Sequence, residues 1–293
     1  MINSEDAIFL FIRIILIMKD INFVYFGTPE FSTIVLDELK NAGYLPSLIV
    51  TAPDRPVGRK HVLTSPPVKV WADKHDIECW QPEKPKYIVE KLQERKDDLY
   101  IVASYGYIVS QKLLDIPRLG VLNVHTSLLP KYRGASPIES AILAGDSETG
   151  STIMKMTLGM DEGPIITQSR FPLESDIVKP DLFHMLAHDG GKLLTQILPD
   201  YIDGKCIPVD QDHTIATYCN KIAKSDGDIT NDSDEIRDRK YRAYYGWPGV
   251  FLFDNEVRLK ITGATFDGTT FTITRVTPAG KKEMNYSEYL KRK

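Results

Sequence analysis

Residues Ile21–Gly27 read INFVYFG, a short apolar run that ends in a glycine. A run of this length and composition is typical of a buried parallel strand, and its terminal glycine permits a tight turn into the next element. Downstream, Phe31–Ala42 predicts a helix, because its apolar residues recur at helical spacing at Phe31, Ile34, Val35 and Leu39. A strand, a glycine turn and a helix in this order predict the start of an α/β fold.

The same alternation continues along the chain. Further strands are predicted at Leu48–Ala52, Leu99–Tyr105 and Val121–His125, and further helices at Val68–His75, Tyr87–Lys96 and Pro137–Leu143. This order predicts a mostly parallel sheet with helices on both faces, whose sites form at the carboxyl ends of the strands. Gly27 supplies only one of the three glycines of a dinucleotide-binding fingerprint, so an NAD site is not favoured.

The pattern changes beyond residue 150. Ser151–Thr157 and Ile165–Leu173 alternate apolar and polar residues on either side of a glycine-rich turn, which predicts a hairpin or strands of a mixed sheet. Pro180–Tyr201 predicts a long helix. From Trp247 onward short strand-like segments form a β module of about 45 residues, which is short for a closed five-stranded barrel.

The composition is that of a soluble globular protein. The 293 residues are 42% hydrophobic and 26% charged with a net charge of −4, which excludes a disordered chain, a collagen-like fibre and a polytopic membrane protein. Three widely spaced cysteines without a Cys-x-x-Cys pair indicate neither a disulfide framework nor a thiolate zinc site, and a cytoplasmic compartment fits best. Residues 237–293 contain 12 Lys and Arg against 6 Asp and Glu, so a basic module follows an acidic body.

The first residues do not have the pattern of a membrane span or a secretory signal. The apolar run Ala7–Met18 contains Arg13 and is shorter than the about 20 residues that a membrane helix needs. Because Met18 directly precedes the first strand, our hypothesis is that translation starts there and that residues 1–17 are an upstream extension, not native. The alternative is an amphipathic anchor, and an N-terminal mass measurement on the native protein distinguishes the two.

Asn123 and His125 lie at the carboxyl end of a predicted central strand, and the alternation of a strand places both on one face. An amide and an imidazole that converge on one point are donors suited to the oxyanion of an acyl transfer. The alternative is a histidine that only hydrogen-bonds within its loop. Ser127 is not favoured as a nucleophile, because the chain contains no Gly-x-Ser-x-Gly elbow.

Asp161 lies between two glycines in the turn of the predicted hairpin. A carboxylate there would orient His125 and stabilise its imidazolium, or else would only bond its own backbone within the turn. His184 and His188, four residues apart on the predicted long helix, have no evident third ligand and are interpreted as surface residues, so no metal site is predicted.

The stretch Pro53–Lys69 is long for a connection in an α/β sheet, where about 2–6 residues are usual. Its cations Arg55, Arg59 and Lys60 suit contacts with phosphate groups, whereas the alternative is a solvated surface loop.

Several segments between about Ile21 and Met284 resemble the methionyl-tRNA formyltransferases. They are FGTPEFS (Phe26–Ser32), PDRPVGR (Pro53–Arg59), SPPVK (Ser65–Lys69), SYGYI (Ser104–Ile108), DIPRLGVLNVHTSLLPKYRGASPI (Asp115–Ile138), GMDEG (Gly159–Gly163), WPG (Trp247–Gly249) and AGKKEM (Ala279–Met284). The motif Asn-x-His-x-Ser-Leu-Leu-Pro with a downstream Asp belongs to all transferases that use 10-formyltetrahydrofolate. GTPEFS, PDRP and SPPVK point more narrowly to the tRNA enzymes.

The resemblance implies a Rossmann-like α/β formyltransferase domain over residues 18–205. A linker and a small, shortened β-barrel-like (OB-type) domain for tRNA follow over residues 206–293. The implied activity is formyl transfer from 10-formyltetrahydrofolate to the amino group of initiator methionyl-tRNA, by direct acyl transfer and without a metal. In this scheme Asn123 and protonated His125 stabilise the oxyanion, while Asp161 holds His125 charged and oriented.

The resemblance also implies binding residues. Those for folate are Tyr105, Gly106, Tyr107, Ile108, Ser127, Leu128, Leu129 and Pro130. Those for tRNA are Arg55, Arg59 and Lys60, together with the basic C-terminal domain. We expect a cytoplasmic monomer without membrane attachment. Two alternatives are a formyltransferase that acts on an amino-sugar nucleotide with the same Asn, His and Asp, and a non-catalytic tRNA-binding protein on the same fold.

Overall fold

The computed structural model describes residues 21–58 and 61–292, so the predicted upstream extension lies outside the described residues. The chain divides into two compact units. The first comprises the described part of Met1–His125 with Thr152–Gln168 and Ala187–Gln211, and the second comprises Thr126–Ser151, Ser169–Leu186 and the described part of Asp212–Lys293. The predicted boundary between two functional domains near residue 205 stays a prediction.

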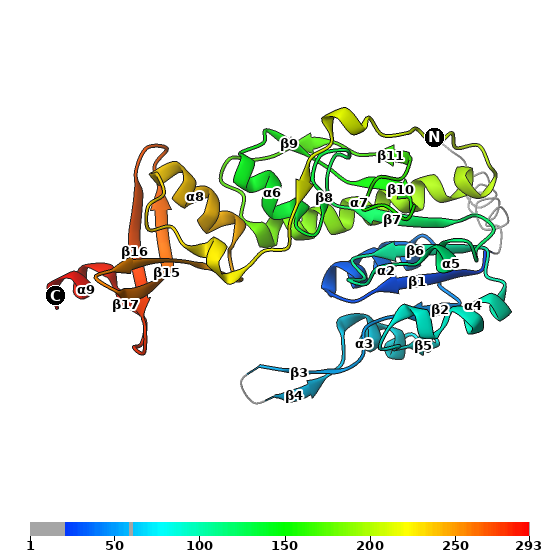
Figure 1. Cartoon of the computed structure of the whole chain (residues 1–293), viewed down its shortest axis with the longest axis horizontal. Helices are drawn as coiled ribbons and strands as arrows, with labels where there is room; N and C mark the ends of the chain where they lie inside the picture. Colours follow the sequence, from blue (N-terminus) through cyan, green and yellow to red (C-terminus); the bar gives the residue numbers. More distant parts are fainter. Residues whose placement is uncertain (1–20, 59–60, 293) are drawn as a thin grey trace, which may run out of the picture. The chain divides into compact units, whose positions relative to one another are not determined.

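A seven-stranded sheet runs through the described part of the first unit in the order β11-β10-β7-β6-β1-β2-β5. Its strands are β1 (Phe23–Gly27), β2 (Leu48–Val50), β5 (Cys79–Trp80), β6 (Leu99–Ala103), β7 (Val121–His125), β10 (Thr152–Lys155) and β11 (Ile165–Gln168). From β5 to β7 all neighbours are parallel, whereas β10 pairs antiparallel with β7 and β11 pairs antiparallel with β10 (Figure 1). The predicted mostly parallel α/β sheet is confirmed.

Helices cover both faces of this sheet, which explains why the central strands β1, β6 and β7 are buried along their whole length. The helices of the first unit are α2 (Glu30–Asn41), α3 (Pro67–Lys74), α4 (Val89–Arg95), α5 (Gln111–Leu114) and the end of α7 (Lys179–Ile202). On one face Val24 and Phe26 of β1 belong to the same core as Leu92 of α4 and Leu113 of α5. Tyr25 alternates with them onto the other face, where its hydroxyl donates to the Ser32 carbonyl of α2 at 2.9 Å.

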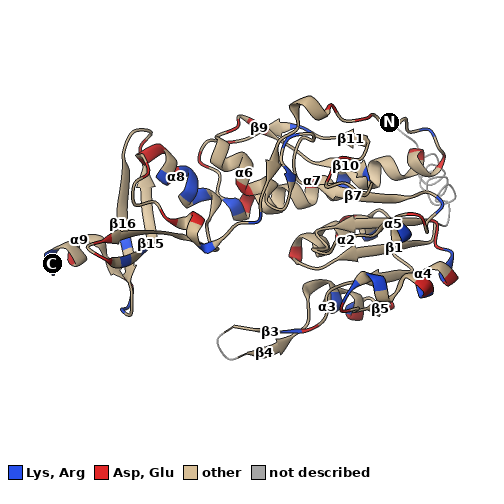
Figure 2. Ribbon diagram, viewed as in Figure 1, with Lys and Arg blue, Asp and Glu red and all other residues tan. Residues whose placement is uncertain are grey.

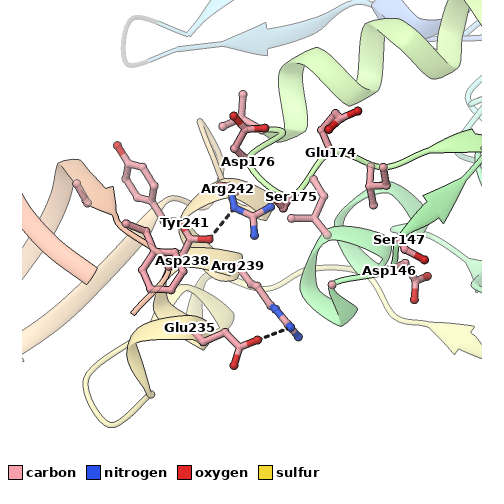
Figure 3. Close-up of a pocket in the computed structure, with 17 residues that line it drawn as sticks. Asp146, Ser147, Glu174, Ser175, Asp176, Glu235, Asp238, Arg239, Tyr241 and Arg242 are labelled. Carbon is pink, nitrogen blue, oxygen red and sulfur yellow. Dashed lines mark hydrogen bonds and ion pairs between the residues drawn. The ribbon is translucent and has the colours of Figure 1, made fainter. Parts of the chain in front are cut away.

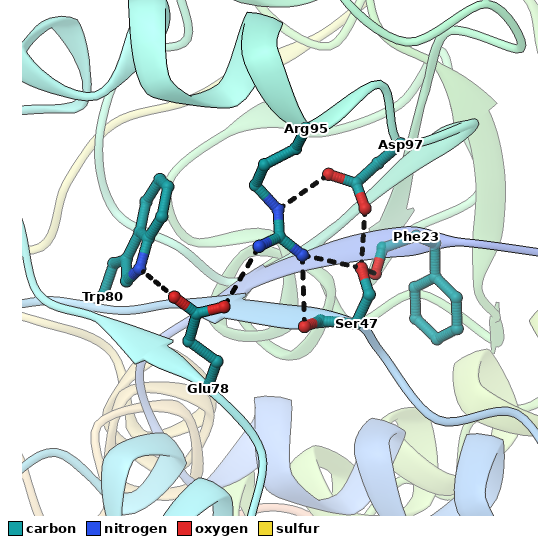
Figure 4. Close-up of polar contacts among 6 residues, drawn as sticks. All are labelled: Phe23, Ser47, Glu78, Trp80, Arg95 and Asp97. Atoms are coloured by element: carbon teal, nitrogen blue, oxygen red, sulfur yellow. Dashed lines mark hydrogen bonds and ion pairs between the residues drawn. The ribbon is translucent and has the colours of Figure 1, made fainter.

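Arg95 forms ion pairs and hydrogen bonds with residues at the amino ends of several strands (Figure 4). Its guanidinium donates to Asp97 and Glu78, each at 3.0 Å, and Ser47 donates to the other carboxylate oxygen of Asp97 at 2.7 Å. Ser47 and Glu78 directly precede β2 and β5, and Asp97 lies two residues before β6. Sites form at the carboxyl ends of the strands of such a sheet. This ion-pair network therefore lies at the end of the sheet away from the expected site.

The stretch predicted only as a loop contains a β-hairpin. In it β3 (Arg55–Val57) pairs antiparallel with β4 (Val62–Thr64). All six residues are exposed, with Val57 at 57% and Val62 at 59%, so the alternation of buried and exposed positions that marks a strand in a sequence is missing. The predicted strand Ile165–Leu173 is also divided. After β11 the chain forms β12 (Phe171–Pro172), which pairs with β9 (Glu148–Thr149). The alternation of apolar and polar residues in the sequence does not show where the chain changes its pairing partner.

The second unit contains the predicted C-terminal β module as an antiparallel sheet of linear order β14-β15-β16-β17. Its strands are β14 (Val250–Asp254), β15 (Val257–Phe266), β16 (Phe271–Pro278) and β17 (Met284–Asn285). The other elements of this unit are β8 (Arg133–Gly134), α6 (Pro137–Ala144), the start of α7, β13 (Tyr218–Cys219), α8 (Asp234–Ala243) and α9 (Tyr286–Lys291). Arg239 of α8 donates to the carbonyl of Ala144 at the end of α6, at 3.0 Å, which fastens α8 to α6.

Candidate active site

Asn123 and His125 lie on β7, as the sequence predicted. This strand is flanked by β6 and β10, with Val102 opposite Asn123 and Thr152 opposite His125. Asn123 is 8% exposed and His125 is 6% exposed. Because the residues alternate with Val124, both side chains share one face of the sheet at the carboxyl end of the strand. An amide donor and a titratable imidazole are thereby adjacent in a largely water-free setting.

The structure brings Asp161 to His125. Asp161 belongs to the loop between β10 and β11, and its Oδ2 lies 3.8 Å from Nδ1 of His125. This separation is within ion-pair range but is longer than a hydrogen bond. Of the two alternatives for Asp161, the geometry favours a carboxylate that faces the imidazole over one that serves only its own turn.

The loop that carries Asp161 is tightly constrained. Asp161 has a φ of 51°, in the left-handed region that non-glycine residues seldom adopt. At Gly163 an added Cβ would lie 1.9 Å from the carbonyl oxygen of Lys155, so only glycine fits there. Gln211 donates through Nε2 to the carbonyls of both Asp161, at 2.9 Å, and Gly163, at 2.7 Å.

Sequence reasoning missed Gln211. It lies in a polar stretch after the long helix, where no periodicity or motif distinguishes it from a solvated residue, yet it is 5% exposed. A buried amide within polar sequence becomes recognisable only once the backbone carbonyls that it satisfies are known.

Tyr105, Gly106 and Ile108 follow β6, the strand next to β7. Tyr105 is buried, and its carbonyl accepts a hydrogen bond of 3.1 Å from the Thr28 hydroxyl at the first turn of the fold. Gly106 has a φ of 81°, and no atom lies within 4 Å of where a Cβ would be, so its backbone borders open space. Ile108 is 88% exposed. An exposed backbone next to an exposed apolar side chain suits a flat, partly polar ring.

Known proteins identify the family of this site. A model of the formyl transferase family matches residues 19–198. The methionyl-tRNA formyltransferase of Halalkalibacterium halodurans is 38% identical over 297 aligned residues, which cover 92% of this chain and 93% of that protein. The chain belongs to the methionyl-tRNA formyltransferase family. It is therefore a formyl-transferring enzyme.

Solved structures share the fold of this formyltransferase. The methionyl-tRNA formyltransferase from Clostridium thermocellum is 14% identical with a TM-score of 0.58, and the match covers 90% of this chain and 99% of that one. An N-formyltransferase from Helicobacter canadensis, solved with folinic acid and dTDP-3-aminofucose, is 18% identical with a TM-score of 0.63, covering 90% and 98%. At these identities the likeness shows the fold alone.

The second predicted folate segment of the formyltransferase, Ser127–Pro130, belongs to the second unit. Ser127 is buried and donates through Oγ to the carbonyl of Lys131 at 2.6 Å, so its hydroxyl holds the loop. Leu129 is also buried and precedes a cis peptide bond to Pro130. Leu128 and Pro130 are half-buried, and the role of the segment in folate binding stays a prediction.

The predicted tRNA contacts of the formyltransferase are only partly described. Arg59 and Lys60 lie outside the described residues. Arg55 is exposed on β3, where its guanidinium lies 3.8 Å from the carboxylate of Glu83 and 3.5 Å from the hydroxyl of Tyr107. The structure thus brings a predicted tRNA residue to a predicted folate residue.

Three cations of α8 are paired with carboxylates. Figure 2 shows Lys and Arg along α8. Arg239 pairs with Glu235 at 2.5 Å, Arg242 with Asp238 at 2.8 Å and Lys240 with Asp232 at 2.7 Å. These cations therefore serve ion pairs within the second unit.

A pocket of about 650 Å³ lies in the second unit beside α8 (Figure 3). It is lined by Asp146, Glu174, Asp176, Tyr241 and the ion pairs of Arg239 and Arg242 with their carboxylates. Its excess of carboxylates does not suit folate or phosphate, and it contains none of the predicted site residues that the structure describes. The described residues also hold no group of His, Cys, Asp and Glu that could bind a metal, and none of the described helices has the length and apolarity to span a bilayer.

Proposed function

We propose that the enzyme transfers the formyl group of 10-formyltetrahydrofolate to the amino group of initiator methionyl-tRNA, and that Asn123, His125 and Asp161 are its catalytic residues. The observation that carries this proposal is the 3.8 Å approach of Asp161 to His125, next to Asn123 on the same face of β7. The name of the 38% identical relative supports the acceptor.

The donor supplies an electrophilic formyl carbon on N10. The free amine of the methionyl ester forms a bond to that carbon, the bond to N10 breaks, and the proton of the amine passes to N10. Asn123 donates its amide N–H to the formyl oxygen as that oxygen gains negative charge, and His125 donates beside it. The carboxylate of Asp161 orients the imidazole and stabilises its positive charge. His125 or a water carries the proton to the leaving nitrogen.

The residues of this chain fit the folate donor. The backbone around Gly106 borders open space, so its N–H and C=O groups suit the amide-like edge of the bicyclic ring of folate. The exposed side chain of Ile108 offers an apolar surface to the face of the same ring. Ser127–Pro130 forms the second proposed contact, with Leu128 and Pro130 half-buried.

We assign the tRNA contacts to Arg55, Arg59 and Lys60 and to the outward face of the C-terminal sheet. On β15, Lys260 alternates with the buried Leu259 and Ile261 and is exposed. Arg258 lies with its guanidinium 3.8 Å from the ring centroid of Phe251. Exposed cations of this kind suit contacts with the phosphates of a nucleic-acid backbone. The enzyme is proposed to act as a monomer in the cytoplasm, and the reducing compartment is in keeping with Cys79 and Cys206, which form no disulfide.

The experiment that tests the proposal compares two acceptors, methionyl-tRNA and a dTDP-linked amino sugar, with 10-formyltetrahydrofolate as donor. Formylation of the tRNA alone is expected. Formylation of the sugar alone would assign the same catalytic residues to the alternative reaction, and no formylation of either by a folded protein would favour the non-catalytic alternative.

A further inference from the structure

Gln211 is a buried amide that serves the loop of Asp161. The Nε2 of Gln211 donates two hydrogen bonds to backbone carbonyls of this loop, those of Asp161 and Gly163. A carbonyl oxygen only accepts, so the amide nitrogen and not the amide oxygen must face the loop. The two N–H groups of one amide thereby satisfy two acceptors on either side of Glu162.

The loop needs an external support. Asp161 has a φ of 51°, and a non-glycine residue in this region persists only where the surroundings enforce it. The conformation turns the side chain of Asp161 toward His125, at 3.8 Å. If the backbone relaxed out of the left-handed region, the carboxylate would move away from the imidazole.

Gln211 itself is anchored to the sheet. Two residues before it, Val209 exchanges a pair of backbone hydrogen bonds with Ile165 of β11, of 2.8 and 2.9 Å. A continuous series of contacts therefore leads from β11 through Val209 and Gln211 to the backbone of Asp161. A rigid strand, not a solvated loop, fixes the position of the carboxylate.

We infer that Gln211 is a positioning residue, which holds the backbone of Asp161 so that its carboxylate faces His125. This inference rests on the proposed catalytic role of Asp161. It assigns to the segment after the long helix a part in the reaction, although Gln211 acts only through Asp161.

Two variants test the inference in the full-length enzyme. Gln211→Met keeps the length of the side chain and removes both donors, and Gln211→Glu keeps the shape and polarity but turns both donors into an acceptor. Because a misplacement of about 1 Å at a catalytic group costs up to about 100-fold in rate, we expect kcat to fall about 10- to 100-fold in each variant. The KM values for the folate donor and for methionyl-tRNA should stay within about twofold, since Gln211 is buried and acts in this scheme only through Asp161.

The matched control is Tyr201→Phe. The Tyr201 hydroxyl donates to the carbonyl of Leu119 at 2.6 Å, so this variant also removes a side-chain hydrogen bond to a backbone carbonyl in the same unit, away from the Asp161 loop. It should retain the kcat of the parent enzyme. Hydrogen exchange of residues 158–163 should accelerate in both Gln211 variants and not in the control.

A double-mutant cycle distinguishes positioning from general structural support. In an Asp161→Ala background, Gln211→Met should reduce kcat by less than about threefold, because residues that act as a unit are not additive. An equal loss in both backgrounds, or an unchanged kcat in the single Gln211 variants, would overturn the positioning role alone. An unchanged kcat in Asp161→Ala would overturn the role of Asp161 in the proposed function and this inference with it.

Discussion

The carboxylate of Asp161 lies 3.8 Å from the imidazole of His125, and Asp161 reaches this position with a φ of 51°. One residue comes from a regular central strand and the other from a strained loop. Strain of this kind concentrates at functional positions, where the surrounding structure maintains it. In this pair, His125 is fixed by a strand of the sheet, and Asp161 is fixed by a loop whose backbone accepts hydrogen bonds from Gln211.

Replacing either donor of β7 should remove catalysis and leave binding intact. We expect Asn123→Ala and His125→Ala each to lower kcat by about 10²- to 10³-fold, because each removes a donor aimed at the developing negative charge. The dissociation constant for tRNA, measured by filter binding, should change little, since both residues are buried. A kcat within twofold of the parent enzyme in either variant would contradict the assigned mechanism.

Two substitutions of Asp161 separate its charge from its backbone. Asp161→Gly and Asp161→Ala both remove the carboxylate and should lose kcat equally. Glycine adopts a φ of 51° without a steric penalty, whereas alanine pays about 1 kcal/mol there. The glycine variant should therefore unfold at a higher urea concentration than the alanine variant. The reverse order of stability would contradict the strain at Asp161.

The sequence predicts the strand residues of the site far better than its loop residues. Alternation and the carboxyl-end rule are sufficient to place Asn123 and His125 together, because both follow from a single local period. The spacing of Asp161 leaves a turn role open, and only the resemblance to a family assigned it to His125. Gln211 has no local signal, because its importance depends on two carbonyls that are distant in the sequence.

The β3–β4 hairpin shows a second limit of sequence patterns. Val57 and Val62 are paired on neighbouring strands but remain exposed, so no buried face imposes an alternation on them. Periodicity detects burial, and a strand without a buried face leaves no such period.

The Arg95 network should matter for stability and not for the reaction. Arg95→Met leaves the buried carboxylate of Asp97 without its cation, and we expect the free energy of unfolding to fall by about 3 kcal/mol. The control is Arg118→Met, which breaks an exposed pair with Asp98 and should cost less than about 1 kcal/mol. Urea titrations measure both losses. Equal losses, or a lower kcat of folded Arg95→Met enzyme, would contradict this account.

Cys79 provides a test of pH dependence. Burial raises the pKa of its thiol to about 11. The folded state therefore favours the protonated thiol, and this contribution to stability is complete below the ordinary pKa of about 8.5 and is lost as the pH rises toward about 11. At pH 8, iodoacetamide should label Cys79 in the native protein about 100-fold more slowly than in urea, because only the thiolate reacts. Peptide mass spectrometry measures this ratio, and equal rates would contradict the raised pKa.

The outward face of the C-terminal sheet should contribute to tRNA affinity. Lys260→Ala is expected to raise the KM for methionyl-tRNA, leave that for the folate donor unchanged, and reduce the salt dependence of tRNA binding by about one unit of slope. Arg275→Ala is the control, because Arg275 already pairs with Glu283 at 2.7 Å and its loss should change the slope less. Identical slopes for Lys260→Ala and the parent enzyme would remove this face from the tRNA contacts.

The measurement that tests the central claim most directly is formyl transfer from 10-formyltetrahydrofolate to initiator and elongator methionyl-tRNA, compared side by side with the parent enzyme. Efficient formylation of the initiator alone is the predicted result. Formylation of neither tRNA by a folded protein that binds folate would contradict the proposed function, and equal formylation of both would contradict its restriction to the initiator.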